Sequence, residues 1–212
     1  MLSSMDVPDP ADASAVERVR GELSELSAAA IDASSMIYML KAGFFGYAAA
    51  ELDFFTAGPV AAEVGWPQLP VRIVDLRRGG EVPWTPDTVE IPEAYVDSTH
   101  RTNDELLLDL ARRRGLALVS EDRGLLERAA EAGRRHYNAL LLLALVHRRG
   151  RLDRAEYAEY ADRLEQIGRY SSEVVSFARA VAAPESAASE SAAPESAAPG
   201  HSESEPDGPG SR

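Results

Sequence analysis

The stretch AAAIDASSMIYMLK, residues 28–41, combines a short apolar run, an aspartate and a helix-forming segment. We interpret the apolar run as a buried strand, because strands of parallel sheets carry continuous apolar sequence. Ser34 and Ser35 are good N-cap residues, so we expect a helix to follow through about Lys41. Asp32 then ends the strand, and in parallel α/β sheets ligands bind at the carboxyl ends of the strands.

The same order of features recurs in LALVSEDRGLLERAAEAG, residues 116–133. Residues 116–120 form another buried apolar run, and a helix is predicted from Asp122 to Ala132. VRIVDL predicts a strand over 71–76, and the proline-containing residues 77–101 predict a long loop. Because short apolar strands alternate with helices, we predict an α/β fold, a three-layer α/β/α domain with a short parallel sheet. The other predicted helices cover 13–26, 47–55, 59–64, 102–114, 138–149, 153–167 and 171–182.

Composition divides the 212 residues into three parts. Residues 1–12 are rich in proline, aspartate and serine and are expected to be a flexible N-terminus. Residues 13–183 are expected to form the domain, with its last helices as a C-terminal extension, since 45% hydrophobic residues suffice for a core. Residues 184–212 form an acidic, low-complexity tail that cannot bury apolar surface and is expected to be disordered.

Charge and cysteine content narrow the function classes. The chain has no cysteine, which excludes disulfides, zinc–thiolate sites and a cysteine nucleophile. The N-terminus does not resemble a signal peptide, and the longest apolar run, residues 139–146, is too short to span a membrane. We therefore expect a cytoplasmic protein with no membrane partner. The net charge is −13, of which the tail contributes −5, and this acidity counts against nucleic-acid binding.

Four acids fall near the predicted ligand edge of the sheet. Asp32 and Asp122 follow strands, Asp104 lies in the first turn of the 102–114 helix, and Glu63 ends the 59–64 helix. Four carboxylates in one pocket would repel each other unless a cation or protons neutralised them. Mg²⁺ or Mn²⁺ prefers oxygen ligands and can activate water at a phosphate.

Each acid also has a structural interpretation. Asp104 suits the helix dipole, while Asp32 and Asp122 suit N-caps. Glu63 works against the dipole at a helix end, and its structural alternative is a solvated surface position.

The segments IDASSMIYML, GPVAAEV, TNDELLLDLA and VSEDRGLLERAAEAG, in this order, resemble the acidic motifs of the PIN-domain family across roughly residues 28–150. The resemblance implies metal ligation by Asp32, Asp104 and Asp122, with Glu63 binding metal or orienting water. It also implies that Ser120 hydrogen-bonds a ligand or the phosphate. Most PIN domains are metal-dependent ribonucleases, so the implied function is endonucleolytic hydrolysis of RNA with Mg²⁺ or Mn²⁺.

Other interpretations stay open at this stage. Many small PIN proteins are toxins, so an antitoxin or another protein is a candidate partner. The first alternative function is a non-catalytic PIN-like module that binds RNA or protein. An aspartyl-nucleophile phosphatase ranks last, because Asp32 lacks a second aspartate two residues on. The leucines of 140–145 predict core, with a homodimer face as the alternative. Arginines at helix ends complement helix dipoles or contact RNA.

Overall fold

The computed structural model describes residues 9, 12–65, 71–75, 80–82 and 102–184. Its strands form a single six-stranded sheet in the order β4-β3-β2-β1-β5-β6. The β3–β4 pair is antiparallel and the other four pairings are parallel, so β3, β2, β1, β5 and β6 form a five-stranded parallel sheet with β4 at its antiparallel edge. The α/β class and the parallel sheet expected from the sequence are confirmed. The strands are β1 (Ala28–Ile31), β2 (Asp53–Ala57), β3 (Arg72–Asp75), β4 (Gly80–Val82), β5 (Ala117–Val119) and β6 (His136–Tyr137).

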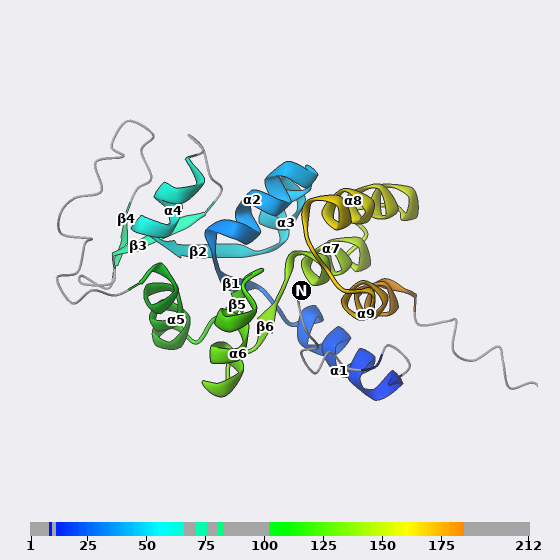
Figure 1. The fold of residues 1–212 in the computed structure, drawn as a ribbon, viewed down its shortest axis with the longest axis horizontal. Helices are drawn as coiled ribbons and strands as arrows, with labels where there is room; N and C mark the ends of the chain where they lie inside the picture. The colour runs from blue at the N-terminus through cyan, green and yellow to red at the C-terminus, as the bar shows by residue number, and fades with distance from the viewer. Residues whose placement is uncertain (1–8, 10–11, 66–70, 76–79, 83–101, 185–212) are drawn as a thin grey trace, which may run out of the picture.

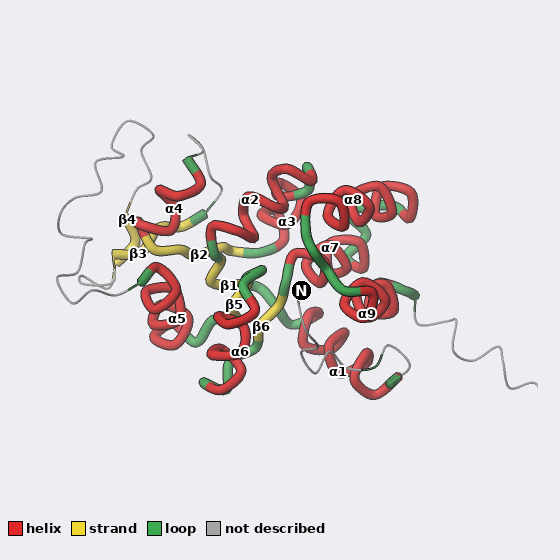
Figure 2. Tube along the Cα trace, in the orientation of Figure 1, coloured by secondary structure: helices red, strands yellow, loops and turns green. Residues whose placement is uncertain are grey.

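Helices cover both faces of the sheet, consistent with a three-layer α/β/α arrangement (Figures 1 and 2). Ala30 of β1 pairs in register with Phe55 of β2 and Leu118 of β5, and this row faces α5 and α6. Their neighbours Ala29 and Ile31 belong to the larger core on the opposite face. The described helices are α1 (Ala13–Ser24), α2 (Ala33–Ala42), α3 (Phe45–Glu51), α4 (Gly58–Val64), α5 (Asn103–Arg114), α6 (Arg123–Glu131), α7 (Ala139–Arg148), α8 (Arg154–Ile167) and α9 (Ser172–Ala182).

Local capping rules place most helix ends where the sequence predicts them. Thr102 and Glu105 form a reciprocal capping box at the start of α5, and Gly115 ends this helix in the left-handed conformation with φ +67°. Asp32, Asp122 and the two capping-box residues all act within three positions of their partners. Such short-range bonds are legible in sequence because they need no tertiary contact.

The predicted helix over 47–55 is wrong in its second half. Helix α3 ends at Glu51, and β2 begins at Asp53 between β1 and β3. Alanines 48–50 favour helix, but Phe54 and Phe55 pack on opposite faces of the sheet, which only a strand allows.

The sequence does not predict two of the short strands, β4 and β6. Strand β4 interrupts the loop predicted over 77–101, and β6 consists of two residues. Runs of two or three residues show no periodicity, so pairing with a neighbouring strand alone defines them. The rest of that loop lies outside the described residues, as do the tail beyond residue 184 and all of the N-terminus to residue 11 except Asp9.

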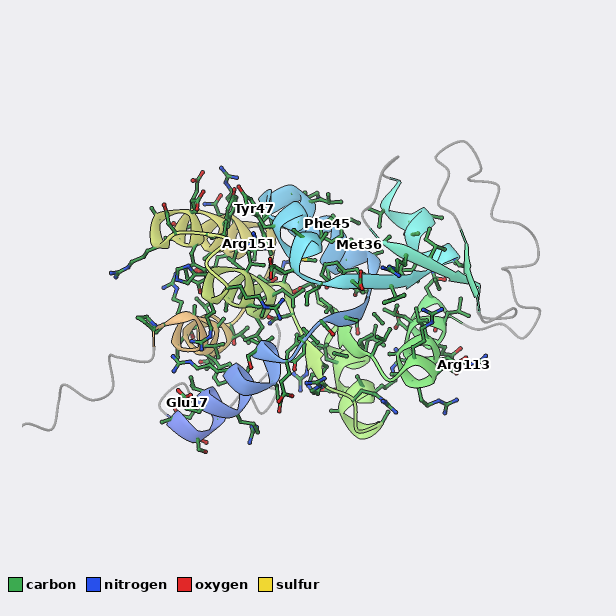
Figure 3. The ribbon with its side chains drawn as sticks, turned by 180° about the vertical axis from the view of Figure 1, so that it is seen from behind. Glu17, Met36, Phe45, Tyr47, Arg113 and Arg151 are labelled. Carbon is green, nitrogen blue, oxygen red and sulfur yellow. The ribbon has the colours of Figure 1, made fainter. Side chains whose placement is uncertain are left out.

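The last three helices pack together beside the sheet, with α7 against α8 and α9 (Figure 1). The leucines of 140–145 are buried apart from the half-buried Leu141, so the core interpretation of this stripe is confirmed. Met36 and Phe45, labelled in Figure 3, belong to the same core on α2 and α3. No helix in the described part of the chain is long and apolar enough to cross a membrane.

Helix α9 is joined to α1 by a buried arginine. Arg20 of α1 donates from Nε to the carbonyl of Val181 at 3.1 Å. It also donates to the carbonyls of Ala180 and Ala183 at 2.6 and 2.8 Å. These carbonyls belong to the last turn and C-cap of a helix, where carbonyls lack the regular partner four residues later within the helix. Arg20 therefore caps α9 from the opposite end of the chain.

Candidate acidic site at the sheet edge

Asp32 is a buried carboxylate held by three donors. Its side chain caps α2, with the backbone N–H of Ser35 donating to Oδ1 at 2.7 Å. The hydroxyls of Ser34 and Ser120 donate to Oδ2 at 2.7 and 2.6 Å. Only 8% of the residue is exposed. Hydrogen bonds to an ionised acceptor are stronger than those between neutral groups. These three bonds fix the position of a carboxyl group at the carboxyl end of β1.

Ser120 connects Asp32 to Asp122. The serine is buried at the end of β5, and its Oγ accepts a hydrogen bond of 2.9 Å from the backbone N–H of Asp122. Asp122 itself caps α6 through the backbone N–H of Leu125 at 2.8 Å. A serine hydroxyl has one proton, and here it goes to Asp32. This geometry favours a role for Ser120 in positioning Asp32 rather than in donating to a bound phosphate.

Glu63 and Asp104 lie further along the same edge, each already engaged. The Nδ2 of Asn103 donates to Glu63, which links the end of α4 to the start of α5. Asp104 forms an ion pair with Arg128 of α6 at 2.7 Å, with side chains 46% and 40% exposed. An exposed pair of this kind contributes roughly 0–1 kcal/mol, so a ligand could displace Arg128 at little cost.

Glu121, between Ser120 and Asp122, is a site residue that sequence analysis did not single out. Its carboxylate turns inward and accepts from the backbone N–H of Ala139 at 2.7 Å and from the hydroxyl of Tyr170 at 2.7 Å. Burial, with a smaller contribution from the charge of Asp32, raises the pKa of Glu121 to about 7.

The sequence suggests no role for the segment RYSSEVVSFA, residues 169–178, but in the structure its Tyr170 contacts Glu121. This tyrosine lies between α8 and α9, and burial together with Glu121 raises its pKa well above its usual value. Gly168 leaves the space for its ring, because a Cβ there would collide with the ring carbons of Tyr170. The segment between α8 and α9 therefore contacts the acidic edge through the hydrogen bond from Tyr170 to Glu121.

The raised pKa of Glu121 predicts a pH-dependent stability. The folded protein binds the Glu121 proton more tightly than the unfolded chain, whose carboxyl keeps its usual value of 4.5. The free energy of unfolding therefore falls as pH rises from 4.5 through 7. Glutamine carries no charge; its oxygen can accept from the N–H of Ala139 and its NH₂ can donate to the hydroxyl of Tyr170. Between pH 4.5 and 8 we expect the stability of Glu121→Gln relative to the wild type to rise by up to about 3 kcal/mol.

Urea denaturation of both proteins at pH 4.5, 6 and 8, in EDTA to remove divalent cations, measures this gain. The difference between the two proteins removes the contribution of all other titrating groups. A difference that stays constant across this range would show that Glu121 titrates normally.

The donor chemistry of this edge fits a hard divalent cation, since all the candidate ligands are carboxylate oxygens. In the described ranges, however, no three histidine, cysteine, aspartate or glutamate side chains gather closely enough to hold a metal ion. In this part of the chain the carboxylates therefore do not form a metal site made of several protein ligands. Mg²⁺ is commonly held by one or two carboxylates and completed by water and substrate phosphates, which is the arrangement these residues fit.

Most arginines at helix ends serve the fold. Arg113, at the end of α5 in Figure 3, pairs with Asp109 at 2.7 Å. Arg151 pairs with Glu51, and Arg149 donates to the carbonyl of Leu26 at 2.5 Å. These contacts match the interpretation of the arginines as structural charges.

Comparison of the chain with protein-family models, with curated proteins and with solved structures finds no match in any of the three.

Proposed function

We propose that this protein is a PIN-like, metal-dependent endoribonuclease. The observation that carries the proposal is the bond of 2.6 Å between Ser120 and Asp32, which joins the ends of adjacent parallel strands. It holds one buried carboxylate in place, and Asp122 follows two residues after Ser120. Ligand sites of parallel α/β sheets occur at this edge.

Within this proposal one or two of Asp32, Asp122 and Asp104 would bind Mg²⁺ or Mn²⁺ directly and the others through water, and Glu63 would bind the metal or orient water. When bound, the metal would supply a nucleophilic water and offset charge on the phosphate. Asp32 contributes a carboxylate that its three donors keep oriented. Asp104 would exchange Arg128 for the metal, which would free the guanidinium of Arg128 to pair with phosphate.

Asp122→Asn tests the proposal because asparagine keeps the N-cap of α6 while removing the charge. The full-length variant and wild type are incubated with a mixed RNA pool in Mn²⁺ or Mg²⁺. We expect cleavage to fall at least about a hundredfold, from lost metal affinity and charge stabilisation. Asp153→Asn is the matched control, because Asp153 caps α8 in the same way. It should cut like wild type.

Equal cutting by Asp122→Asn and Asp153→Asn would place the activity elsewhere or in a contaminant. Absence of cutting by all three proteins would favour a second candidate, a non-catalytic PIN-like module that binds RNA or a protein partner. The ion pair of Asp104 with Arg128 favours that candidate, because it already neutralises one proposed ligand.

A further inference from the structure

A second site lies away from the acids, on the side of the sheet edge strand β6. A cleft of about 510 Å³ opens between α1, α6 and α9. Its volume falls in the range of roughly 300–1,000 Å³ that is typical of small-molecule sites. None of Asp32, Glu63, Asp104 and Asp122 lines it, so the cleft is not part of the proposed ribonuclease site.

Part of the wall of the cleft is apolar. Val19 of α1, Leu126 of α6 and Phe177 of α9 line it, together with Leu141 and Val174. They belong to four helices that are distant in sequence, and Leu126 and Phe177 are themselves buried. Such a wall accommodates a hydrocarbon or aromatic group.

The lining of the cleft also contains cationic side chains. Arg18, Arg134 and Arg135 line it, and only Glu22 among the lining residues is acidic. Arg135 is partly neutralised, because it lies 3.8 Å from Glu25 and donates to the carbonyl of Glu22. The carboxylate of Glu22 accepts from the hydroxyl of Tyr137 at 3.3 Å.

Arg134 supplies the observation that points to a ligand. It directly follows Gly133, and its Nε is buried with no hydrogen-bond partner among the described residues. A buried donor without a partner costs roughly 1–3 kcal/mol, and more when it is charged. Within the described ranges neither Arg134 nor Arg18 has a carboxylate within 4.0 Å. An anion entering the cleft would give both guanidiniums a partner.

We propose that this cleft binds an amphipathic organic anion, a carboxylate or phosphate carried on an apolar group. The head group pairs with Arg134 and Arg18, because guanidinium matches the bidentate geometry of both kinds of anion. The apolar group lies against Val19, Leu141 and Phe177. This proposal does not depend on the ribonuclease function, because the two sites share no residue.

The probe is 8-anilinonaphthalene-1-sulfonate, an aromatic anion whose fluorescence rises in apolar surroundings, titrated into the full-length protein. We expect saturable binding that octanoate and octyl phosphate displace. Octylammonium and inorganic phosphate should displace it at least about tenfold less well, because each lacks one half of the recognised chemistry. Displacement by octylammonium as readily as by octanoate would overturn the proposed charge selectivity. Displacement by inorganic phosphate as readily as by octyl phosphate would overturn the role of the apolar wall.

Two variants localise the binding. Arg134→Met is expected to weaken probe affinity about tenfold through loss of a charged hydrogen bond. Arg154→Met, at an exposed position at the start of α8, is the control and should bind like wild type. Ala130→Glu places a tethered carboxylate in the cleft and should also weaken binding, which keeps the test valid if Arg134→Met does not fold. Unchanged affinity in a folded Arg134→Met or in Ala130→Glu would show that the probe binds elsewhere.

Discussion

Replacing Asp32 by asparagine is expected to lower metal-dependent RNA cleavage by roughly a thousandfold, which corresponds to several kcal/mol of lost charge stabilisation. This is the largest effect on activity that the proposed function implies. Asp32 is the most buried of the four acids and the one fixed by three donors. Asparagine keeps the volume, the N-cap of α2 and an acceptor for Ser35, but it carries no charge.

The same substitution should leave the fold in place. We expect the free energy of unfolding to change by about 1 kcal/mol, since the hydroxyls of Ser34 and Ser120 can rotate to accept from the new amide. Cleavage assays and urea denaturation on the same preparations separate activity from stability. Asp12→Asn is the matched control, because Asp12 caps α1. Cleavage by Asp32→Asn at the rate of this control would contradict the assignment of Asp32.

Arg20→Met is expected to have the largest effect on stability, lowering the free energy of unfolding by about 3 kcal/mol. The substitution keeps most of the apolar stem but removes donors to Ala180, Val181 and Ala183. The carbonyl of Val181 loses its side-chain donor, at a cost of roughly 1–3 kcal/mol. The carbonyls of Ala180 and Ala183 lose their shorter bonds and keep bonds of 3.3 Å from the backbone N–H of Ala183 and from Arg148. The ion pair with Glu17 adds little, because the Glu17 side chain is 59% exposed.

Urea denaturation compares Arg20→Met with Arg18→Met, an exposed position of the same helix. We expect the control to change stability by less than about 0.5 kcal/mol. Glu17→Gln should resemble the control if the helix-end carbonyls carry the effect. A loss in Glu17→Gln as large as that in Arg20→Met would instead assign the stability to the ion pair.

If α9 is held mainly through Arg20, its loosening should reach the acidic edge. Helix α9 follows directly after Tyr170, which donates to Glu121. Arg20 at the end of α9 and Tyr170 before its start thus connect this helix to α1 and to the carboxyl ends of the strands.

Much of the candidate site could be predicted from the sequence because it depends on local chemistry. Asp32 and Asp122 each follow a short apolar run and cap the next helix through a residue three positions later. The pattern of buried strand, acid and helix therefore predicts both their position at the sheet edge and their capping. Thr102 and Glu105 are predictable for the same reason.

The tertiary structure decided what depends on partners distant in sequence. Strand β2 forms at Asp53–Ala57 because β1 and β3 flank it, although the preceding alanines favour helix. Ser120 meets Asp32 across 88 positions, Tyr170 meets Glu121 across 49, and Arg20 meets Val181 across 161. The sequence by itself determined most helix ends and the acids that cap α2 and α6, since hydrogen bonds within a few residues set both. The tertiary structure alone decided which distant side chains form hydrogen bonds. Packing of the sheet and helices brings these partners together, and no local sequence pattern encodes them.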